Sequence, residues 1–237
     1  MRATNWEFTN RAMVFGLIFG CTFPLYVVDP QNSSAALANW LGPRVSWNPD
    51  VLARLLFAAA ALLMAIAAFI RTWASAYLHA SVVYAADVKS AALVADGPYR
   101  RVRNPLYFAN ILMAIAMGVL MSRLGIVLAV VGTIWFCYRL ILREESELEA
   151  SQGESYRAYC KAVPRLWPSP WPRIPSAGGQ PKWADGLKAE LWYWGFAAAL
   201  TAFAVTLQIK LFFAIFAASL ILFWVSSAML KKKSNPL

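Results

Sequence analysis

The chain has 237 residues, of which 60% are hydrophobic, 14% are charged and 11 are tryptophan. Soluble domains are about half apolar and about a quarter charged, so this composition excludes an ordinary soluble domain and is typical of an integral membrane protein. The formal net charge of +10 then indicates basic flanks on membrane helices, and we expect a membrane partner and no nucleic acid. The three cysteines show neither a CxxC pair nor a metal-ligand spacing, so we expect no metal site.

Six apolar segments are long enough to cross a bilayer at about 1.5 Å per residue. We predict that they form an all-α, polytopic membrane helix bundle, and they are Ala12–Val28, Val51–Ile70, Pro105–Met121, Leu124–Leu142, Leu191–Leu207 and Leu211–Leu230. Only Ser122 and Arg123 separate the third segment from the fourth, which predicts a tight antiparallel hairpin. We expect Asp29–Asp50 to be a loop and Arg71–Asn104 to lie along the membrane interface.

The distribution of basic residues predicts the orientation. Most of the 22 Lys and Arg residues lie near the N-terminus, in 71–104, in 143–188 and in the tail at Lys231–Lys233. Basic segments are enriched on the cytoplasmic side of membrane proteins. We therefore predict an integral, multi-pass membrane protein with both termini in the cytoplasm and with the inner ends of the third and fourth spans on that side.

Two polar stretches lie at the ends of the predicted hairpin. The first, Gly97–Tyr107, holds three arginines, which cannot remain unpaired in hydrocarbon. The second begins with Glu144 and Glu145, directly after the fourth span. Because the hairpin brings its two ends together, we expect Arg103 to lie close to these carboxylates. The cluster is then either a salt-bridge network that closes the inner end of the bundle or a functional site, and the residues alone leave both open.

These stretches resemble the isoprenylcysteine carboxyl methyltransferase and phospholipid methyltransferase group. The group has the pattern Gly-Pro-Tyr-x-x-x-Arg-His-Pro-x-Tyr, followed by Glu-Glu, a leucine, Gly-x-x-Tyr-x-x-Tyr and Val-Pro-Arg. The matching residues are Gly97, Pro98, Tyr99, Arg103, Pro105, Tyr107, Glu144, Glu145, Leu148, Gly153, Tyr156, Tyr159, Val163, Pro164 and Arg165. The resemblance covers about residues 90–168. Asn104 stands where the group often has histidine, which removes a possible charge but keeps a side chain that donates and accepts hydrogen bonds.

The resemblance implies a methyltransferase that uses S-adenosylmethionine, with a membrane-embedded active site that faces the cytoplasm. The cofactor would enter from the cytoplasm, and a lipid or prenylated acceptor would come from the bilayer. The residues that we expect to be catalytic are Arg103, Glu144, Glu145 and Arg139. Those that we expect to bind the cofactor are Tyr99, Val102, Arg103, Asn104, Pro105, Tyr107, Glu144 and Tyr156.

The chemistry of the cofactor matches several of these residue types. Arg103 suits the carboxylate of S-adenosylmethionine, in a bidentate pair where geometry allows. Glu144 or Glu145 suits the ribose hydroxyls or the amino group. The rings of Tyr99 and Tyr107 suit the adenine or the sulfonium cation, because an aromatic face attracts a cation.

The acceptor and two rival functions stay open at this stage. A prenylcysteine carboxylate, a phospholipid amine and another isoprenoid group all fit, and an acidic acceptor needs a cationic partner such as Arg139 or Arg165. One rival is an NADPH-dependent membrane reductase, since integral sterol reductases resemble the stretch Tyr159–Pro164. The other is a non-catalytic membrane scaffold.

We divide the chain into three parts. Residues 1–89 form an N-terminal transmembrane hairpin with an interfacial segment, and residues 90–175 form the methyltransferase-like core with its cofactor-binding motifs. Residues 176–237 form a C-terminal transmembrane hairpin with a basic tail. This hairpin lies outside the resemblance, and a lid, a dimer contact and a wall of the lipid entrance are all open as its role.

Overall fold

A computed structural model describes residues 2–87 and 95–234, and it leaves the side chains of 79–87 and 226–234 outside the description. The side chains of the basic tail at Lys231–Lys233 and the stretch 88–94 therefore fall outside what is described. The described residues are helical and contain no β-strand, so the all-α prediction is confirmed. The α-helices are α1 (Asn5–Thr9), α2 (Arg11–Gly20), α3 (Ser33–Val45), α4 (Pro49–Asp87), α5 (Pro105–Met117), α6 (Arg123–Gln152), α7 (Glu154–Ala162), α8 (Trp183–Ala189), α9 (Leu191–Thr206) and α10 (Ile209–Ser234).

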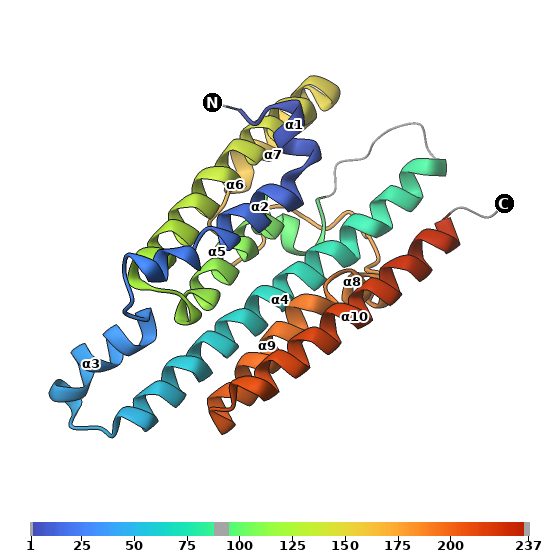
Figure 1. The fold of residues 1–237 in the computed structure, drawn as a ribbon. Coiled ribbons are helices and arrows are strands. Elements are labelled where there is room, and N and C mark those ends of the chain that lie inside the picture. Colours follow the sequence, from blue (N-terminus) through green and yellow to red (C-terminus); the bar gives the residue numbers. More distant parts are fainter. Residues whose placement is uncertain (1, 88–94, 235–237) are drawn as a thin grey trace.

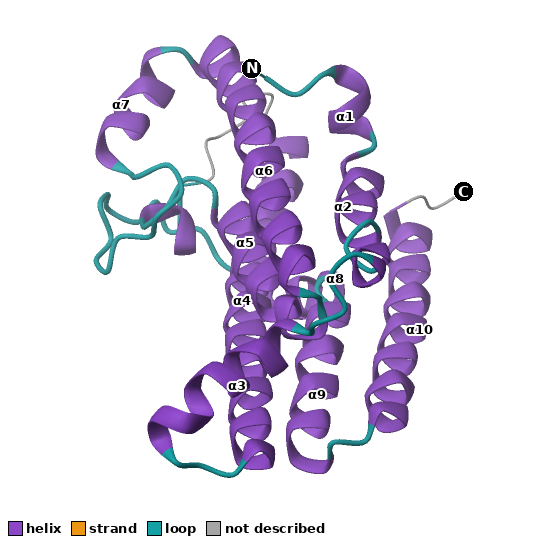
Figure 2. Cartoon of the chain, turned by 60° about the vertical axis from the view of Figure 1, so that its left-hand side comes forward, coloured by secondary structure: helices purple, strands orange, loops and turns teal. Residues whose placement is uncertain are grey.

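Helix α4 is the central element of the bundle. It packs against α9 on one side and against α5 on the other, while α10 covers α9 and α6 covers α5 (Figure 1). Helix α3 and the turn between α9 and α10 lie at one end of the bundle, and α1 and α7 lie at the other (Figures 1 and 2). We call this second end, where α5 begins and α6 finishes, the motif end.

Two helices are long and apolar enough to cross a membrane, namely Pro49–Leu78 of α4 and Arg123–Gln152, which is α6. Shorter apolar helices coincide with the other predicted spans: Arg11–Val27, Pro105–Leu120, Leu191–Thr206 and Ile209–Val225. Large apolar side chains of α6, such as Val131 and Trp135, are exposed, which is typical of a surface that faces lipid. The number of crossings and the cytoplasmic placement of the termini stay predictions.

The predicted hairpin between the third and fourth segments is present. Pro105 is the first residue of α5, a position that proline favours because its missing N–H has no intrahelical partner there. Ser122 caps α6, with its side-chain oxygen 3.0 Å from the backbone nitrogen of Gly125. Asn32 at the start of α3 closes the turn by donating to the carbonyl oxygens of Val119 and Met121.

Three expectations about the N-terminal half are wrong. The predicted span Ala12–Val28 is interrupted, since α2 ends at Gly20 and Pro24 starts a separate 3₁₀ turn, Pro24–Val27. The expected loop at Asp29–Asp50 contains α3, whose N-terminus is capped by a side chain that accepts two backbone hydrogen bonds. The second span does not stop at Ile70, because neither glycine nor proline interrupts the sequence after it and α4 continues to Asp87.

The C-terminal part of the chain packs along α4. Gly186 of α8 lies so close that a Cβ atom there would be 2.6 Å from the carbonyl oxygen of Thr72. Trp194 of α9 donates its indole N–H to the Thr72 hydroxyl at 3.0 Å. Near the other end of α9, Arg54 donates to the carbonyl oxygens of Ala204 and Val205. Helices α4 and α9 are therefore joined by polar contacts at both ends of their shared interface.

Candidate active site

A tight turn sets the start of the site. Gly97 begins a 3₁₀ turn, Gly97–Arg100, with φ +59, a left-handed conformation that favours glycine. A Cβ atom at this position would also lie 2.4 Å from the ring of Tyr77 on α4. The turn therefore fixes the polar stretch before α5 against α4 and directs Arg103 and Asn104 toward the end of α6.

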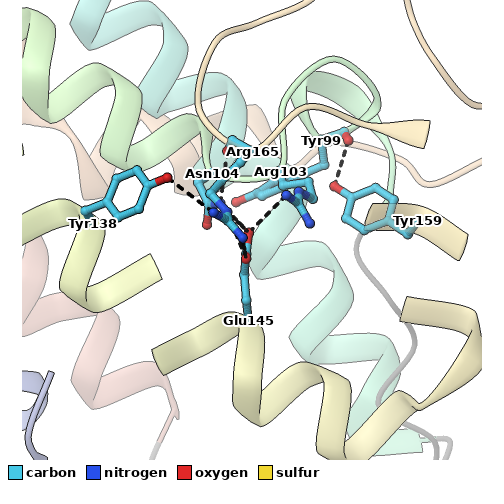
Figure 3. Close-up of polar contacts among 7 residues, drawn as sticks. All are labelled: Tyr99, Arg103, Asn104, Tyr138, Glu145, Tyr159 and Arg165. Carbon is cyan, nitrogen blue, oxygen red and sulfur yellow. Dashed lines mark hydrogen bonds and ion pairs between the residues drawn. The ribbon is translucent and has the colours of Figure 1, made fainter. Parts of the chain in front are cut away.

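Glu145 is the centre of a polar cluster at the motif end (Figure 3). Its carboxylate lies 2.9 Å from Nη2 and 3.0 Å from Nε of Arg165. Nη2 of Arg103 lies 3.5 Å away, and Nδ2 of Asn104 lies 3.4 Å away. The hydrogen bond to Glu145 raises the pKa of Arg165, so that its guanidinium stays charged. We call Arg103, Asn104, Tyr138, Glu145 and Arg165 the Glu145 cluster.

Glu144, the neighbouring carboxylate, has a different partner. It accepts a hydrogen bond from the Tyr107 hydroxyl at 2.7 Å. Successive residues of a helix point about 100° apart, so the two glutamates of α6 face different sides of the start of α5. The predicted closeness of Arg103 to the two glutamates is confirmed as an ion pair with Glu145, while Glu144 binds a neutral hydroxyl.

Arg103 is incompletely paired. Its side chain is 10% exposed, and its Nε is buried without a hydrogen-bond partner among the described residues. Its contact with Glu145 is long at 3.5 Å, whereas its backbone N–H donates to the Pro164 carbonyl at 2.9 Å. A buried guanidinium nitrogen without an acceptor is costly. The backbone of Arg103 is therefore fixed, while its side chain retains capacity for an anionic ligand.

The segment 163–182 covers the arginine stretch. The Ser169 and Arg173 N–H groups donate to the carbonyls of Arg101 and Arg100, at 2.9 and 2.8 Å. Asp96 holds the far part of this segment, because its carboxylate accepts hydrogen bonds from the Ser176 hydroxyl and from two backbone N–H groups. Burial raises the pKa of Asp96, but these hydrogen bonds outweigh the burial, and the net pKa lies below its usual value.

Arg139 lies outside the Glu145 cluster. Its Nη2 forms an ion pair with Glu7 of α1 at 2.6 Å, and its guanidinium lies over the ring of Trp135 at 4.9 Å. Its backbone carbonyl also accepts a hydrogen bond from the Ala3 N–H at 3.1 Å. This arginine fastens the N-terminal segment to α6, so the geometry does not bring it to the other residues that we expected to be catalytic.

The remaining predicted cofactor residues are buried. Tyr156 packs with Tyr159 and Val163, and the two tyrosine rings are 6.0 Å apart. The Tyr159 hydroxyl donates to the backbone carbonyl of Tyr99 at 2.8 Å, and burial raises the pKa of Tyr159. Val102 is 2% exposed. In this arrangement Tyr156 and Tyr159 pack α7 against the turn before α5.

A second set of polar side chains, which the sequence analysis missed, lies deeper in the bundle. Arg71 of α4 pairs with Glu190, and both are linked to Asn110 of α5 and Tyr193 of α9. We call Arg71, Ser75, Asn110, Glu190 and Tyr193 the Arg71 network. Asn110 could have been identified from the sequence, because it is a single amide in an apolar helix, three residues after Tyr107.

The comparisons with known proteins agree with the two motifs. Residues 55–154 match the family model of phospholipid methyltransferases. The matched part runs through α4 and α5 to the end of α6, and so includes Arg103, Glu144 and Glu145. This part of the chain is similar to the phospholipid methyltransferases, the group that its two motifs resemble.

One curated protein shows how far the similarity extends beyond the family model. The chain is 22% identical over 174 residues to the cobalt-zinc-cadmium resistance protein CzcN of Cupriavidus metallidurans. The alignment covers 70% of this chain and 76% of that protein. No solved structure matches the chain significantly.

Proposed function

We propose that this protein transfers a methyl group from S-adenosylmethionine to a lipidic acceptor that reaches the site from the bilayer. The family supports methyl transfer in a membrane. The observation that carries the proposal is the buried, unpaired Nε of Arg103 beside a long ion pair. A guanidinium with a free edge is the group that binds a carboxylate in bidentate geometry, and S-adenosylmethionine carries such a carboxylate.

The described residues fit the rest of the cofactor. When bound, S-adenosylmethionine supplies an electrophilic methyl group on a sulfonium, and its departure leaves neutral S-adenosylhomocysteine. Arg103 would hold the carboxylate, and Glu144 would accept hydrogen bonds from the amino group or the ribose hydroxyls. Tyr107 is held by its bond to Glu144, and its ring would contact the adenine or the sulfonium. Orientation of this kind supplies much of the rate in a displacement.

Glu145 has a positioning role in this proposal. Its carboxylate is shared by Arg103, Asn104 and Arg165, so it orients both arginines. Asn104, which replaces the histidine of the family pattern, uses Nδ2 to bond Glu145 and the Arg165 carbonyl oxygen, the latter at 3.0 Å. At this position the amide joins the polar stretch before α5 to the Val163-Pro164-Arg165 motif without adding charge.

The acceptor would approach along the outer face of α6. Arg165 is 36% exposed at its side chain, and its Nη1 donates to the hydroxyl of Tyr138 at 3.2 Å. Tyr138 is 43% exposed and follows exposed apolar residues of the same helix, such as Trp135. Arg165 is therefore a better partner than Arg139 for an acidic acceptor group, because the Arg139 side chain is only 13% exposed and is paired with Glu7 of α1.

The two acceptor classes make different demands on the carboxylates. A carboxylate acceptor attacks the methyl group directly and releases no proton. An amine acceptor must lose a proton, and Glu144 suits this task better than Glu145, because Glu144 bonds the neutral Tyr107 hydroxyl whereas Glu145 bonds two arginines. The pH dependence of the rate therefore separates the two classes.

The test uses the full chain purified in detergent or reconstituted in lipid. Titration with S-adenosylhomocysteine is expected to show saturable binding, and NADPH is expected to show none. Incubation with methyl-labelled S-adenosylmethionine and a lipid extract is expected to place the label in a lipid product. Saturable binding of NADPH together with no binding of S-adenosylhomocysteine would replace this proposal by a reductase, and binding of neither would leave a scaffold.

A further inference from the structure

A buried ion pair joins the C-terminal part of the chain to α4. Arg71 lies within the apolar stretch Pro49–Leu78 that is long enough to span a membrane. Its Nε lies 2.6 Å from Oε2 of Glu190, and its Nη2 lies 3.1 Å from Oε1. The side chains are 18% and 4% exposed. Charged groups at such positions are costly, so an intramembrane pair of this kind calls for a functional explanation.

The rest of the Arg71 network completes the hydrogen bonding of this pair. Nη1 of Arg71 donates to Oδ1 of Asn110 at 2.7 Å, and the Tyr193 hydroxyl donates to the same oxygen at 2.8 Å. The Ser75 hydroxyl donates to Oε1 of Glu190 at 2.7 Å, and the guanidinium lies over the Tyr193 ring at 4.4 Å. Each guanidinium nitrogen of Arg71 thus has an acceptor, whereas Nε of Arg103 has none among the described residues.

One face of α5 links this network to the proposed cofactor site. Asn104, Tyr107 and Asn110 follow one another at intervals of three residues, which places them on neighbouring positions of a helix surface. Each is buried, and each bonds a charged side chain: Glu145, Glu144 and Arg71 in turn. The hydrogen bond between Asn110 and Arg71 therefore also fixes the rotation of α5 that presents Asn104 and Tyr107 to the site.

Tyr99 is buried between the start of α5 and its neighbours. Its side chain is 9% exposed and belongs to the turn directly before α5. Burial raises the pKa of Tyr99, and the charges of Glu144, Arg71 and Glu190 all contribute to its value. The phenol therefore lies within electrostatic reach of the site and of the Arg71 network.

We propose that Arg71 and Glu190 are positioning residues for the cofactor site, and that the C-terminal hairpin is an essential part of the enzyme because it supplies Glu190 and Tyr193. The inference rests on the proposed function. The family match ends at residue 154, so both residues lie outside it. Through its hydrogen bond to Asn110, Arg71 sets the rotation of α5 and with it the geometry offered to S-adenosylmethionine.

A simple structural clamp is the competing explanation, and a double substitution separates the two. Replacing a buried ion pair by apolar residues of similar volume commonly preserves stability, whereas removing one partner does not. We therefore compare Glu190→Leu alone with the double variant Arg71→Met/Glu190→Leu. The control is Arg123→Met/Asp29→Leu, because Arg123 donates to Asp29 through Nε and Nη2 at the opposite end of α6.

The readouts are the thermal midpoint and the dissociation constant for S-adenosylhomocysteine. We expect Glu190→Leu to lose both stability and affinity. We expect the double variant of Arg71 and Glu190 to regain stability but to bind S-adenosylhomocysteine about tenfold or more weakly, since small displacements of positioning groups carry large penalties. The control double variant should bind as the wild type does.

The outcomes distinguish this inference from the proposed function. If the wild type binds S-adenosylhomocysteine and the apolar Arg71 and Glu190 variant binds it equally well, the pair is only a clamp and the inference is wrong. If the wild type itself does not bind S-adenosylhomocysteine, the proposed function fails. If the double variant does not fold, Arg71→Lys and Glu190→Gln are measured instead. Unchanged affinity for S-adenosylhomocysteine in both of these folded variants overturns the inference.

Discussion

The Glu145 cluster and the Arg71 network are both built from arginine, glutamate and asparagine, but they differ in how completely they are paired. In the network each guanidinium nitrogen of Arg71 has an acceptor at 2.6 to 3.1 Å. In the cluster the Arg103 contact is 3.5 Å long and Nε is buried without a partner among the described residues. A saturated network holds a structure in place, whereas a cluster with unused donors can take up a ligand.

The largest effect is expected from removing the carboxylate of the saturated network. Glu190→Ala leaves the Arg71 guanidinium buried without its counter-ion, which typically costs about 3–5 kcal/mol of stability. The free energy of unfolding in a mixed-detergent titration measures this loss. Glu149→Ala is the control, because Glu149 and its partner Arg157 are both more than half exposed. Equal losses in the two variants would remove the distinction between a buried network and a surface pair.

Removing Arg103, the incompletely paired arginine, should weaken ligand binding more than stability, which is the reverse of the effect expected at Glu190. Arg103→Ala is expected to weaken S-adenosylhomocysteine binding about 100-fold, or about 2.7 kcal/mol, with a small change in thermal midpoint, since Arg165 and Asn104 still bond Glu145. Calorimetric titration measures the affinity, and Arg157→Ala serves as the exposed control. A variant that binds as the wild type does would show that the unpaired Nε has no ligand role.

A smaller effect is expected at Tyr107. Tyr107→Phe removes the hydrogen bond that Glu144 accepts at 2.7 Å while keeping the aromatic ring. Bonds to charged groups contribute about 1.5–3 kcal/mol, so we expect roughly a tenfold fall in kcat/KM in the labelled-methyl assay. Tyr26→Phe is a control, because the Tyr26 hydroxyl bonds the Leu120 carbonyl at the other end of α5. A control that loses as much activity would show that general packing explains the result.

The smallest effect concerns Asp96 and depends on pH. Its pKa in the folded protein is lower than the ordinary value of 3.8, so the carboxylate contributes stability above pH 3.8 that is lost as the pH falls through the folded pKa. Asp96→Asn lacks this contribution. Pepsin cleavage of the segment 163–182 should therefore be faster in Asp96→Asn than in the wild type at pH 5, with the difference shrinking toward pH 3. A constant difference would contradict this role.

Local patterns predicted the elements that position the site. The short polar interval at Ser122 and Arg123 correctly indicated a hairpin, because so few residues can only reverse the chain. The positions of the two motifs at the ends of this hairpin correctly predicted that Glu145 lies beside Arg103. Which of the two glutamates would pair with the arginine was not predictable, because it depends on the rotation of α6 about its axis, and packing against neighbouring helices sets that rotation.

Long-range partners were missed for a physical reason. Glu190 is a single acidic residue before an apolar helix, and its partner Arg71 is 119 positions earlier. No periodicity or local spacing relates two such residues, since only tertiary packing brings them together. The helix α3 was missed because proline, asparagine and serine in Asp29–Asp50 indicate a loop, while Asn32 in fact acts as a helix cap.

The two arginine contacts between α4 and α9 have a mechanical consequence. Arg54 holds the carbonyls at the last turn of α9, and Arg71 holds Glu190 at its first turn, about 25 Å further along α4 at 1.5 Å per residue. These contacts hold the two helices together at both ends of their shared interface. In the proposed function, an acceptor with a hydrocarbon chain would then approach the opposite flank, where Arg165 donates a hydrogen bond to Tyr138.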